Sequence, residues 1–133
     1  MGSDTTGSVR LPAAATGTVG IIPTPGRLSL DGILPNCWSL DNPGPFTWTI
    51  ADSATVLQSI ADPTHWDGPA PPAFRRAVGQ DVRGMRVAVV TDVGPGMAEP
   101  DNEMAAAFEA GLEVLRGLGV ELVETRLPVT PAT

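Results

Sequence analysis

The sequence predicts an α/β fold, and three observations support this prediction. Residues 86–128 follow the order strand, helix, strand that is typical of a βαβ unit. Short apolar pieces separated by glycine and proline precede this unit and predict brief strands and turns. Hydrophobic residues make up 42% of the 133 residues and charged residues 17%, a balance that indicates a globular rather than a disordered chain.

The first elements are expected to be short. A helix is predicted after Ser8, because Pro12 suits a first helical turn and Gly17 suits the position just beyond a helix. The segment 18–22 (TVGII) is predicted to be a brief buried strand, which the following proline stops. Residues 27–34 (RLSLDGIL) predict a second short strand that leads into a turn at its Asp-Gly pair.

A loop rich in proline and glycine is predicted over residues 36–48, and a helix is predicted to follow it. Thr49 and Asp52 have the spacing of a capping box, and the helix runs to about residue 61. Its apolar face is spaced helically and comprises Ile50, Ala54, Leu57 and Ala61, with Val56 and Ile60 alongside. The three tryptophans (Trp38, Trp48 and Trp66) are expected to pack within the protein.

The remainder divides into a connector and the βαβ unit. Residues 62–80 are rich in proline and are interpreted as a surface connector rather than a domain boundary. Residues 86–90 predict a strand, and a helix capped at Asp101 or Asn102 is predicted to end before Gly119. Residues 120–128 alternate apolar and polar, which predicts a second strand parallel to the first. The helix is expected to bury one side, formed by Met104, Phe108, Leu112, Leu115 and Leu118.

Composition argues against several classes of function. The net charge is −7 and all eight basic residues are arginines, so nucleic-acid binding is not expected. Cys37 and His65 are single residues of their types, so an internal disulfide and Cys- or His-rich metal sites are not expected, and no cofactor is predicted. No apolar run approaches the roughly 20 residues of a membrane-spanning helix. Without a signal-peptide pattern, the chain is expected to be cytoplasmic and free of membrane contact.

The stretch GSDTTGS is the candidate for chemistry. Ser8 precedes a predicted helix, and the N–H groups of the residues before it can point into one small concavity. A hydroxyl beside such donors is the arrangement of a nucleophile next to an oxyanion hole. By composition alone, an ordinary glycine- and threonine-rich loop is the favoured explanation of the stretch.

A longer string resembles the amidase signature family. GSDTTGSVRLPAAATGTVGIIPTPGRLSLDGILPNCWSLDNPGP is similar to the family's GSDTGGS string, its KPT-x-GR turn and its SLD-x-x-GP loop, in that order and spacing. The resemblance extends over nearly the whole chain. It implies part of a mixed-sheet α/β fold with covering helices, and it makes residues 1–133 a partial amidase domain, with the nucleophile loop and following helix in 1–61, the connector in 62–80 and the βαβ segment in 81–133.

The resemblance also implies an activity and site residues. Family members hydrolyse carbon–nitrogen amide bonds with a nucleophilic serine, a bridging serine and a base lysine, and the match places the nucleophile at Ser8. The oxyanion would be bound by the N–H groups of Thr5, Thr6, Gly7 and Ser8, while Asp4 and Arg10 would brace the loop by hydrogen bonds. The expected substrate is a small-molecule amide, and the expected partners are the remaining amidase segments or a second copy of the chain.

The sequence departs from the family pattern at several points. The bridging serine and the lysine of the family lie upstream of the matched string, and this sequence contains no lysine at all. An arginine cannot replace that base because it stays protonated. Thr6 stands where the family has glycine, Ile22 replaces a lysine, and Trp48 replaces an arginine. Two functions therefore stay open: an amide hydrolase represented by a fragment, or a non-catalytic segment or amidotransferase A-type piece that needs another chain.

Overall fold

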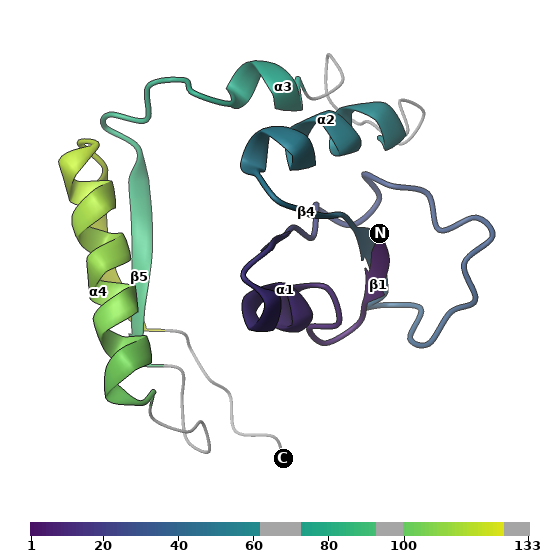
Figure 1. Ribbon diagram of the computed structural model, residues 1–133, viewed down its shortest axis with the longest axis horizontal. Coiled ribbons are helices and arrows are strands. Elements are labelled where there is room, and N and C mark those ends of the chain that lie inside the picture. The colour runs from purple at the N-terminus through teal and green to yellow at the C-terminus, as the bar shows by residue number, and fades with distance from the viewer. Residues whose placement is uncertain (62–72, 93–99, 127–133) are drawn as a thin grey trace. The chain divides into compact units, whose positions relative to one another are not determined.

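The computed structural model describes residues 1–61, 73–92 and 100–126, which belong to two compact units (Figure 1). The first unit is Met1–Gln80 and the second is Asp81–Thr133. Both contain helices and short strands, which confirms the predicted α/β class. The two units divide at the end of the expected connector, whose residues 62–72 lie outside the described part of the chain.

The first unit is built from short elements. In chain order they are β1 (Gly2–Asp4), α1 (Arg10–Thr16), β2 (Val19–Gly20), β3 (Asn42–Gly44), β4 (Phe46–Thr47), α2 (Ile50–Ile60) and α3 (Phe74–Ala77). Two antiparallel ladders form, β1 with β3 and β2 with β4. The expected loop 36–48 therefore contains two strands that were not predicted, because strands of two or three residues are too short to show a period in the sequence.

Helix α1 forms where the sequence predicts it. Pro12 lies in its first turn, and Gly17 follows it in the left-handed region, with φ of 66° and its N–H donating to the Ala13 carbonyl oxygen. Glycine adopts this conformation without steric cost. The buried strand predicted at 18–22 is shorter than expected, since β2 covers two residues, and both of these are only half-buried.

The core of the first unit fixes the chain on one side of Ser8. Its buried apolar side chains are Val9, Ala13, Leu28, Ala54 and Leu57. Gly20 approaches α1 so closely that an added Cβ would lie 2.6 Å from the Cβ of Ala13. Val9 has no exposed surface and directly follows Ser8, so core packing holds the backbone at the candidate nucleophile.

The strand predicted at 27–34 is wrong, whereas its turn is confirmed. The N–H of Ile33 donates to the Leu30 carbonyl oxygen at 3.0 Å, and Gly32 has φ of 81°. Within the described residues no strand pairs with this segment, and Leu28 packs into the core from irregular backbone instead.

The prediction that the tryptophans pack within the protein is wrong for Trp38 and Trp48. Trp38 is 82% exposed and Trp48 is 81% exposed, whereas residues 41–45 are the buried part of this loop. Trp66 lies outside the described residues.

Helix α2 begins at the predicted capping residue. Thr49 Oγ1 accepts the Asp52 N–H at 3.1 Å and donates to Asp52 Oδ2 at 2.8 Å. The face of α2 that packs inward carries Ser53, Ala54 and Leu57, whereas Ile50 is more than half exposed. Helix α3, within the segment predicted to be a connector, packs against α2.

We expect Thr49→Ala to lower the free energy of unfolding of the first unit by about 1 kcal/mol, because it removes the N-cap acceptor. Urea unfolding followed by circular dichroism measures the change. Thr55→Ala is the matched control, since the Thr55 hydroxyl donates only to the Ala51 carbonyl oxygen within the helix. Equal losses in the two variants would show that the cap contributes nothing.

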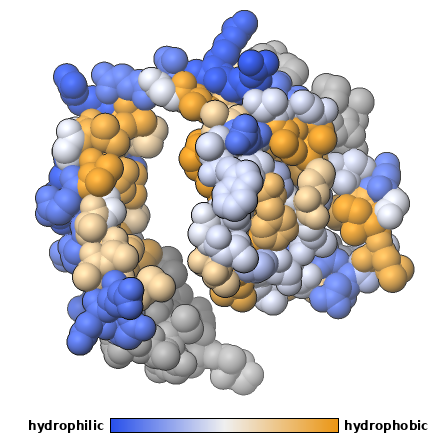
Figure 2. Space-filling view, viewed as in Figure 1, coloured by the Kyte–Doolittle hydropathy of each residue, from blue (hydrophilic) through white to orange (hydrophobic). Residues whose placement is uncertain are grey.

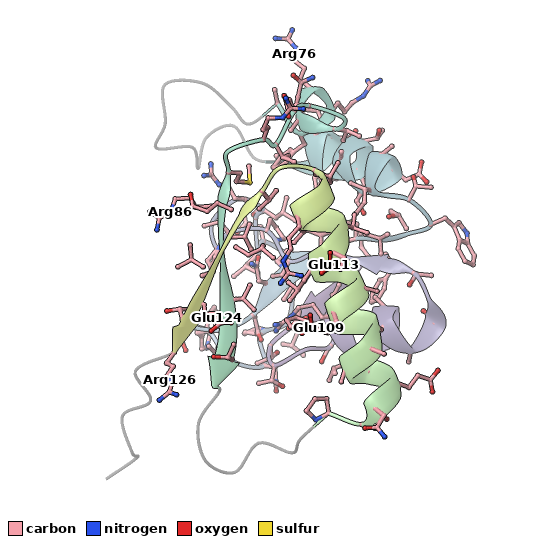
Figure 3. All side chains as sticks on the ribbon, turned by 90° about the vertical axis from the view of Figure 1, so that its left-hand side faces the viewer. Arg76, Arg86, Glu109, Glu113, Glu124 and Arg126 are labelled. Atoms are coloured by element: carbon pink, nitrogen blue, oxygen red, sulfur yellow. The ribbon has the colours of Figure 1, made fainter. Side chains whose placement is uncertain are left out.

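The second unit is the predicted βαβ unit. Its elements are β5 (Arg86–Asp92), α4 (Asn102–Gly117) and β6 (Glu121–Arg126). The strands are parallel, as predicted, with Arg86 opposite Glu121. Asp101 is the N-cap of α4 and accepts the Met104 N–H at 2.8 Å. Figure 3 shows the two strands side by side next to α4, with the labelled charged side chains Glu109 and Glu113 on the helix and Glu124 and Arg126 on β6.

The apolar face predicted for α4 is only partly buried. Leu112 is buried and Leu115 is half-buried, but Met104, Phe108 and Leu118 are each more than half exposed. Figure 2 shows apolar residues on the surface of this unit. A sheet of two strands covers only a narrow stripe of a helix, so the rest of this face has no cover among the described residues of the unit.

Candidate active site

Ser8 lies in the loop between β1 and α1, and its side chain is exposed. The residues on either side of it, Gly7 and Val9, are buried. The hydroxyl therefore reaches solvent from a backbone that is packed on both sides.

The buried carboxylate of Asp4 holds this loop by hydrogen bonds. Its side chain is 1% exposed, and Oδ1 accepts the Gly7 N–H at 2.7 Å while Oδ2 accepts the Val9 N–H at 3.0 Å. Oδ2 also accepts the Arg10 N–H at 3.3 Å. The Arg10 guanidinium donates to both oxygens, from Nε at 3.3 Å and from Nη2 at 3.2 Å.

The electrostatics of Asp4 follow from these bonds. The Arg10 guanidinium holds the pKa of Asp4 well below its usual range; burial acts in the opposite direction, and the backbone N–H groups of Val9, Gly7 and Arg10 lower it further. Asp4 is thus a charged acceptor at neutral pH with its oxygens occupied, which suits it to hold the loop rather than to exchange protons.

The four N–H groups expected to bind an oxyanion differ in the structure. The Gly7 N–H is already donated to Asp4. Within the described part of the chain, those of Thr5, Thr6 and Ser8 donate to no protein acceptor. Donors left open beside an exposed hydroxyl are what stabilisation of a tetrahedral oxyanion requires.

Thr6 occupies its position without backbone strain. Every described non-glycine residue has φ outside the positive region, whereas Gly7 has φ of 131°. A Cβ added to Gly7 would lie 2.9 Å from the Leu11 side chain. The requirement for glycine in this loop therefore falls on Gly7, and the threonine one residue earlier is compatible with the loop geometry.

Asp41 joins a second loop to the loop of Ser8. Its Oδ1 accepts the Thr5 hydroxyl at 2.5 Å, and its Oδ2 accepts the N–H groups of Asn36 at 2.6 Å and Cys37 at 2.9 Å. The Thr5 hydroxyl and these N–H groups lower the pKa of Asp41, against the effect of burial. The sequence carries no sign of the link to Thr5, because the two residues lie 36 positions apart.

Asn42 adds a third attachment at the same place. Its Nδ2 donates to the Pro23 carbonyl oxygen, and in the β1–β3 ladder Asn42 lies opposite Asp4. The loop of Ser8, the turn at Pro23 and the loop at 36–41 are thus held together around the start of β3.

The first unit also contains a hollow of about 480 Å³, formed by the segment after β2 together with α2 and α3. Most of its lining is apolar and includes Ile22, one of the positions that departs from the resembled string. Ser8 is not among the residues that line this hollow.

Neither a metal site nor a membrane span is seen in the residues that the structure describes. They contain no group of three or more His, Cys, Asp or Glu side chains suited to a metal ion, and His65 lies outside them. None of the helices in this part of the chain has the length and apolar character needed to cross a bilayer.

Comparison with known proteins gives a consistent result. The family model described as Amidase matches residues 1–133. The chain is 40% identical over 133 residues to the A-type subunit of the glutamyl-tRNA(Gln) amidotransferase of Rhodospirillum rubrum, covering 97% of this chain and 26% of that protein. It is 40% identical over 134 residues to an amidase of Pseudomonas putida, covering 96% of this chain and 28% of that protein. The chain thus spans about a quarter of the length of these relatives.

Solved structures agree on the fold. A crystal structure of an amidase is 31% identical, with a TM-score of 0.68 over 96% of this chain and 26% of that one. An allophanate hydrolase of Kluyveromyces lactis, 24% identical, has a TM-score of 0.73 over 96% of this chain and 20% of that one. At this lower identity the second likeness concerns the fold alone.

Proposed function

The chain belongs to the amidase family, and from this premise we propose that it is the nucleophile-bearing segment of an enzyme that hydrolyses small-molecule amides. One observation carries the proposal: the exposed Ser8 hydroxyl adjoins three N–H groups that no protein acceptor uses among the described residues, on a loop held by Asp4.

The proposed reaction begins with attack of Ser8 Oγ on the amide carbonyl carbon. The carbonyl oxygen becomes an oxyanion, which the N–H groups of Thr5, Thr6 and Ser8 bind, while Gly7 gives its N–H to Asp4. The C–N bond then breaks, the amine leaves with a proton, and water hydrolyses the acyl-enzyme. Such donors stabilise an oxyanion most where water is excluded and where the direction of the N–H groups is fixed before the reaction. We assign to Asp4 and Arg10 the role of fixing that direction.

The proton of Ser8 must pass to a base. The sequence has no lysine, and the arginines stay protonated. Asp4 and Asp41 have their oxygens occupied by hydrogen bonds. Among the described residues that hold this loop, none is suited to take the proton, and we propose that the base comes from another amidase segment that assembles with residues 1–133.

A second candidate function rests on the same absence of lysine. The segment would then be non-catalytic, or would serve as part of an amidotransferase A-type protein, the class to which the Rhodospirillum rubrum relative belongs by name. The non-catalytic candidate differs from the first in that Ser8 stays unreactive when the remaining segments are supplied.

A chimaera tests the choice. Residues 1–133 replace the matching part of the Pseudomonas putida amidase, and ammonia release from simple amides is measured together with labelling by a fluorophosphonate probe. We expect an active, labelled chimaera, loss of activity by about 10³-fold or more in Ser8→Ala, and no labelling of the isolated chain. Ser3→Ala, which alters an exposed serine in β1, is the matched control.

Each contrary result has a distinct meaning. A folded but inactive chimaera supports the non-catalytic candidate. Activity that survives Ser8→Ala removes Ser8 as the nucleophile. Turnover by the isolated chain would show that a base lies within the 133 residues.

A further inference from the structure

The bridge between Asp41 and Thr5 has a role beyond holding one turn. Asp41 is 8% exposed and accepts hydrogen bonds on both oxygens, from Thr5 on one and from Asn36 and Cys37 on the other. Its carboxylate is therefore shared between two loops that are distant in sequence.

The Thr5 side of the bridge bears on the proposed oxyanion donors. Thr5 is the first of the three residues whose N–H groups use no protein acceptor among those described, and its side chain donates to Asp41 while also accepting from Asn36 Nδ2 at 3.4 Å. Asp4 holds the later part of the same loop through Gly7 and Val9. Between Asp4 and Gly7, the hydroxyl of Thr5 makes the side-chain attachment that ties this part of the loop to the rest of the unit.

We propose that Asp41 is a positioning residue: through the Thr5 hydroxyl it sets the backbone of Thr5 and Thr6, and so the direction of their N–H groups beside Ser8. This inference rests on the proposed function for its catalytic meaning, because it concerns the donors assigned to the oxyanion. The link itself is a physical property of the chain and can be measured in the absence of turnover.

Thr5→Val tests the link, since it removes the hydroxyl and keeps the branched shape. Backbone order parameters of Thr5, Thr6 and Ser8 are expected to fall from about 0.85 to below about 0.6. Cys37, the single thiol of the chain, reports on the other side of the bridge. Its rate of reaction with a soluble thiol reagent is expected to rise about tenfold when the charge-assisted hydrogen bond between the Thr5 hydroxyl and Asp41 is lost.

Three further variants make the result specific. Thr5→Ser retains a hydroxyl and is expected to restore both the backbone order parameters and the rate of Cys37 reaction to the wild-type values. It is also expected to show a slowly exchanging hydroxyl proton resonance that Thr5→Val lacks. Thr55→Val makes the same chemical change on the exposed side of α2 and is expected to leave both readings at the wild-type value. Thr5→Ala, which introduces no added bulk, takes the place of Thr5→Val if that variant does not fold by circular dichroism.

The outcomes separate this proposal from the proposed function. Unchanged order parameters and unchanged Cys37 reactivity in Thr5→Val overturn the positioning role, whether or not Ser8 is a nucleophile. The same changes in Thr55→Val overturn it as well, because the effect would then be general loosening. Loss of order in Thr5→Val with rescue by Thr5→Ser supports the role even where the chimaera is inactive.

Discussion

Asp4→Ala is expected to unfold the loop of Ser8 and to lower the free energy of unfolding of the first unit by about 3 kcal/mol, since each buried donor left without a partner costs about 1–3 kcal/mol. The substitution leaves the N–H groups of Gly7 and Val9 without the carboxylate that accepts them, in a place where both residues are buried. Arg10 contributes less to this loss, because its side chain is 58% exposed and remains solvated.

Urea unfolding measured by the amide resonances of the first unit determines the cost. Asp31→Ala is the matched control, because Asp31 is exposed and its carboxylate makes no hydrogen bond among the described residues. If Asp4→Ala were as stable as Asp31→Ala, the loop would be held by the packing of Val9 alone.

The same carboxylate predicts a dependence on pH. The pKa of Asp4 is lowered in the folded chain, chiefly by Arg10, so below the unfolded-state pKa of about 4 the unfolded chain binds more protons than the folded one. The stability from Asp4 is therefore complete above about pH 4 and is lost as the pH falls toward the folded-state pKa. Asp4→Asn should show a flatter fall in stability between about pH 4 and pH 2.5. Equal slopes for wild type and Asp4→Asn would mean that Asp4 is not the group responsible.

The parts of the fold that sequence patterns predict are those that depend on neighbouring residues. Thr49 and Asp101 are caps because their side chains reach N–H groups three residues ahead, and Gly17 ends a helix through its own backbone conformation. The strands and the helix of the βαβ unit are long enough for their apolar periods to be recognised in the sequence. The strands β1 and β3 have no such mark, because their pairing joins residues about 40 positions apart.

The candidate site divides in the same way. The motif predicts a candidate nucleophile at Ser8, but not which residue needs to be glycine, since that depends on the backbone turn that gives Gly7 its positive φ. The attachment of Thr5 to Asp41 joins residues far apart in the chain, so a pattern within one segment could not reveal it. The exposure of Trp38 similarly depends on which surfaces meet in three dimensions.

Gly44→Ala is expected to cause the second large effect, because it places an atom where another backbone already lies. A Cβ on Gly44 would be 2.1 Å from the Ile21 carbonyl oxygen, which is a backbone atom with little freedom to move. Relief requires β3 to shift, and β3 pairs Gly44 with Gly2 and Asn42 with Asp4. We expect a loss of about 3 kcal/mol or more in the first unit, the upper range for added bulk in a packed interior.

Gly111→Ala provides the contrast, since nothing lies within 4 Å of a Cβ added there and the residue is inside α4. Alanine should stabilise that helix by about 0.5–1 kcal/mol. Amide resonances from residues 1–61 should broaden or vanish in Gly44→Ala while those of β5 and β6 persist, and Gly111→Ala should leave the first unit unaltered. A Gly44→Ala chain that keeps the first unit stable, with the Gly7 amide still bound to Asp4, would show that the Ile21 carbonyl can withdraw without disturbing the ladder. The position of the Ser8 loop would then depend on Asp4 and Asp41 rather than on the close approach of β3 to Ile21.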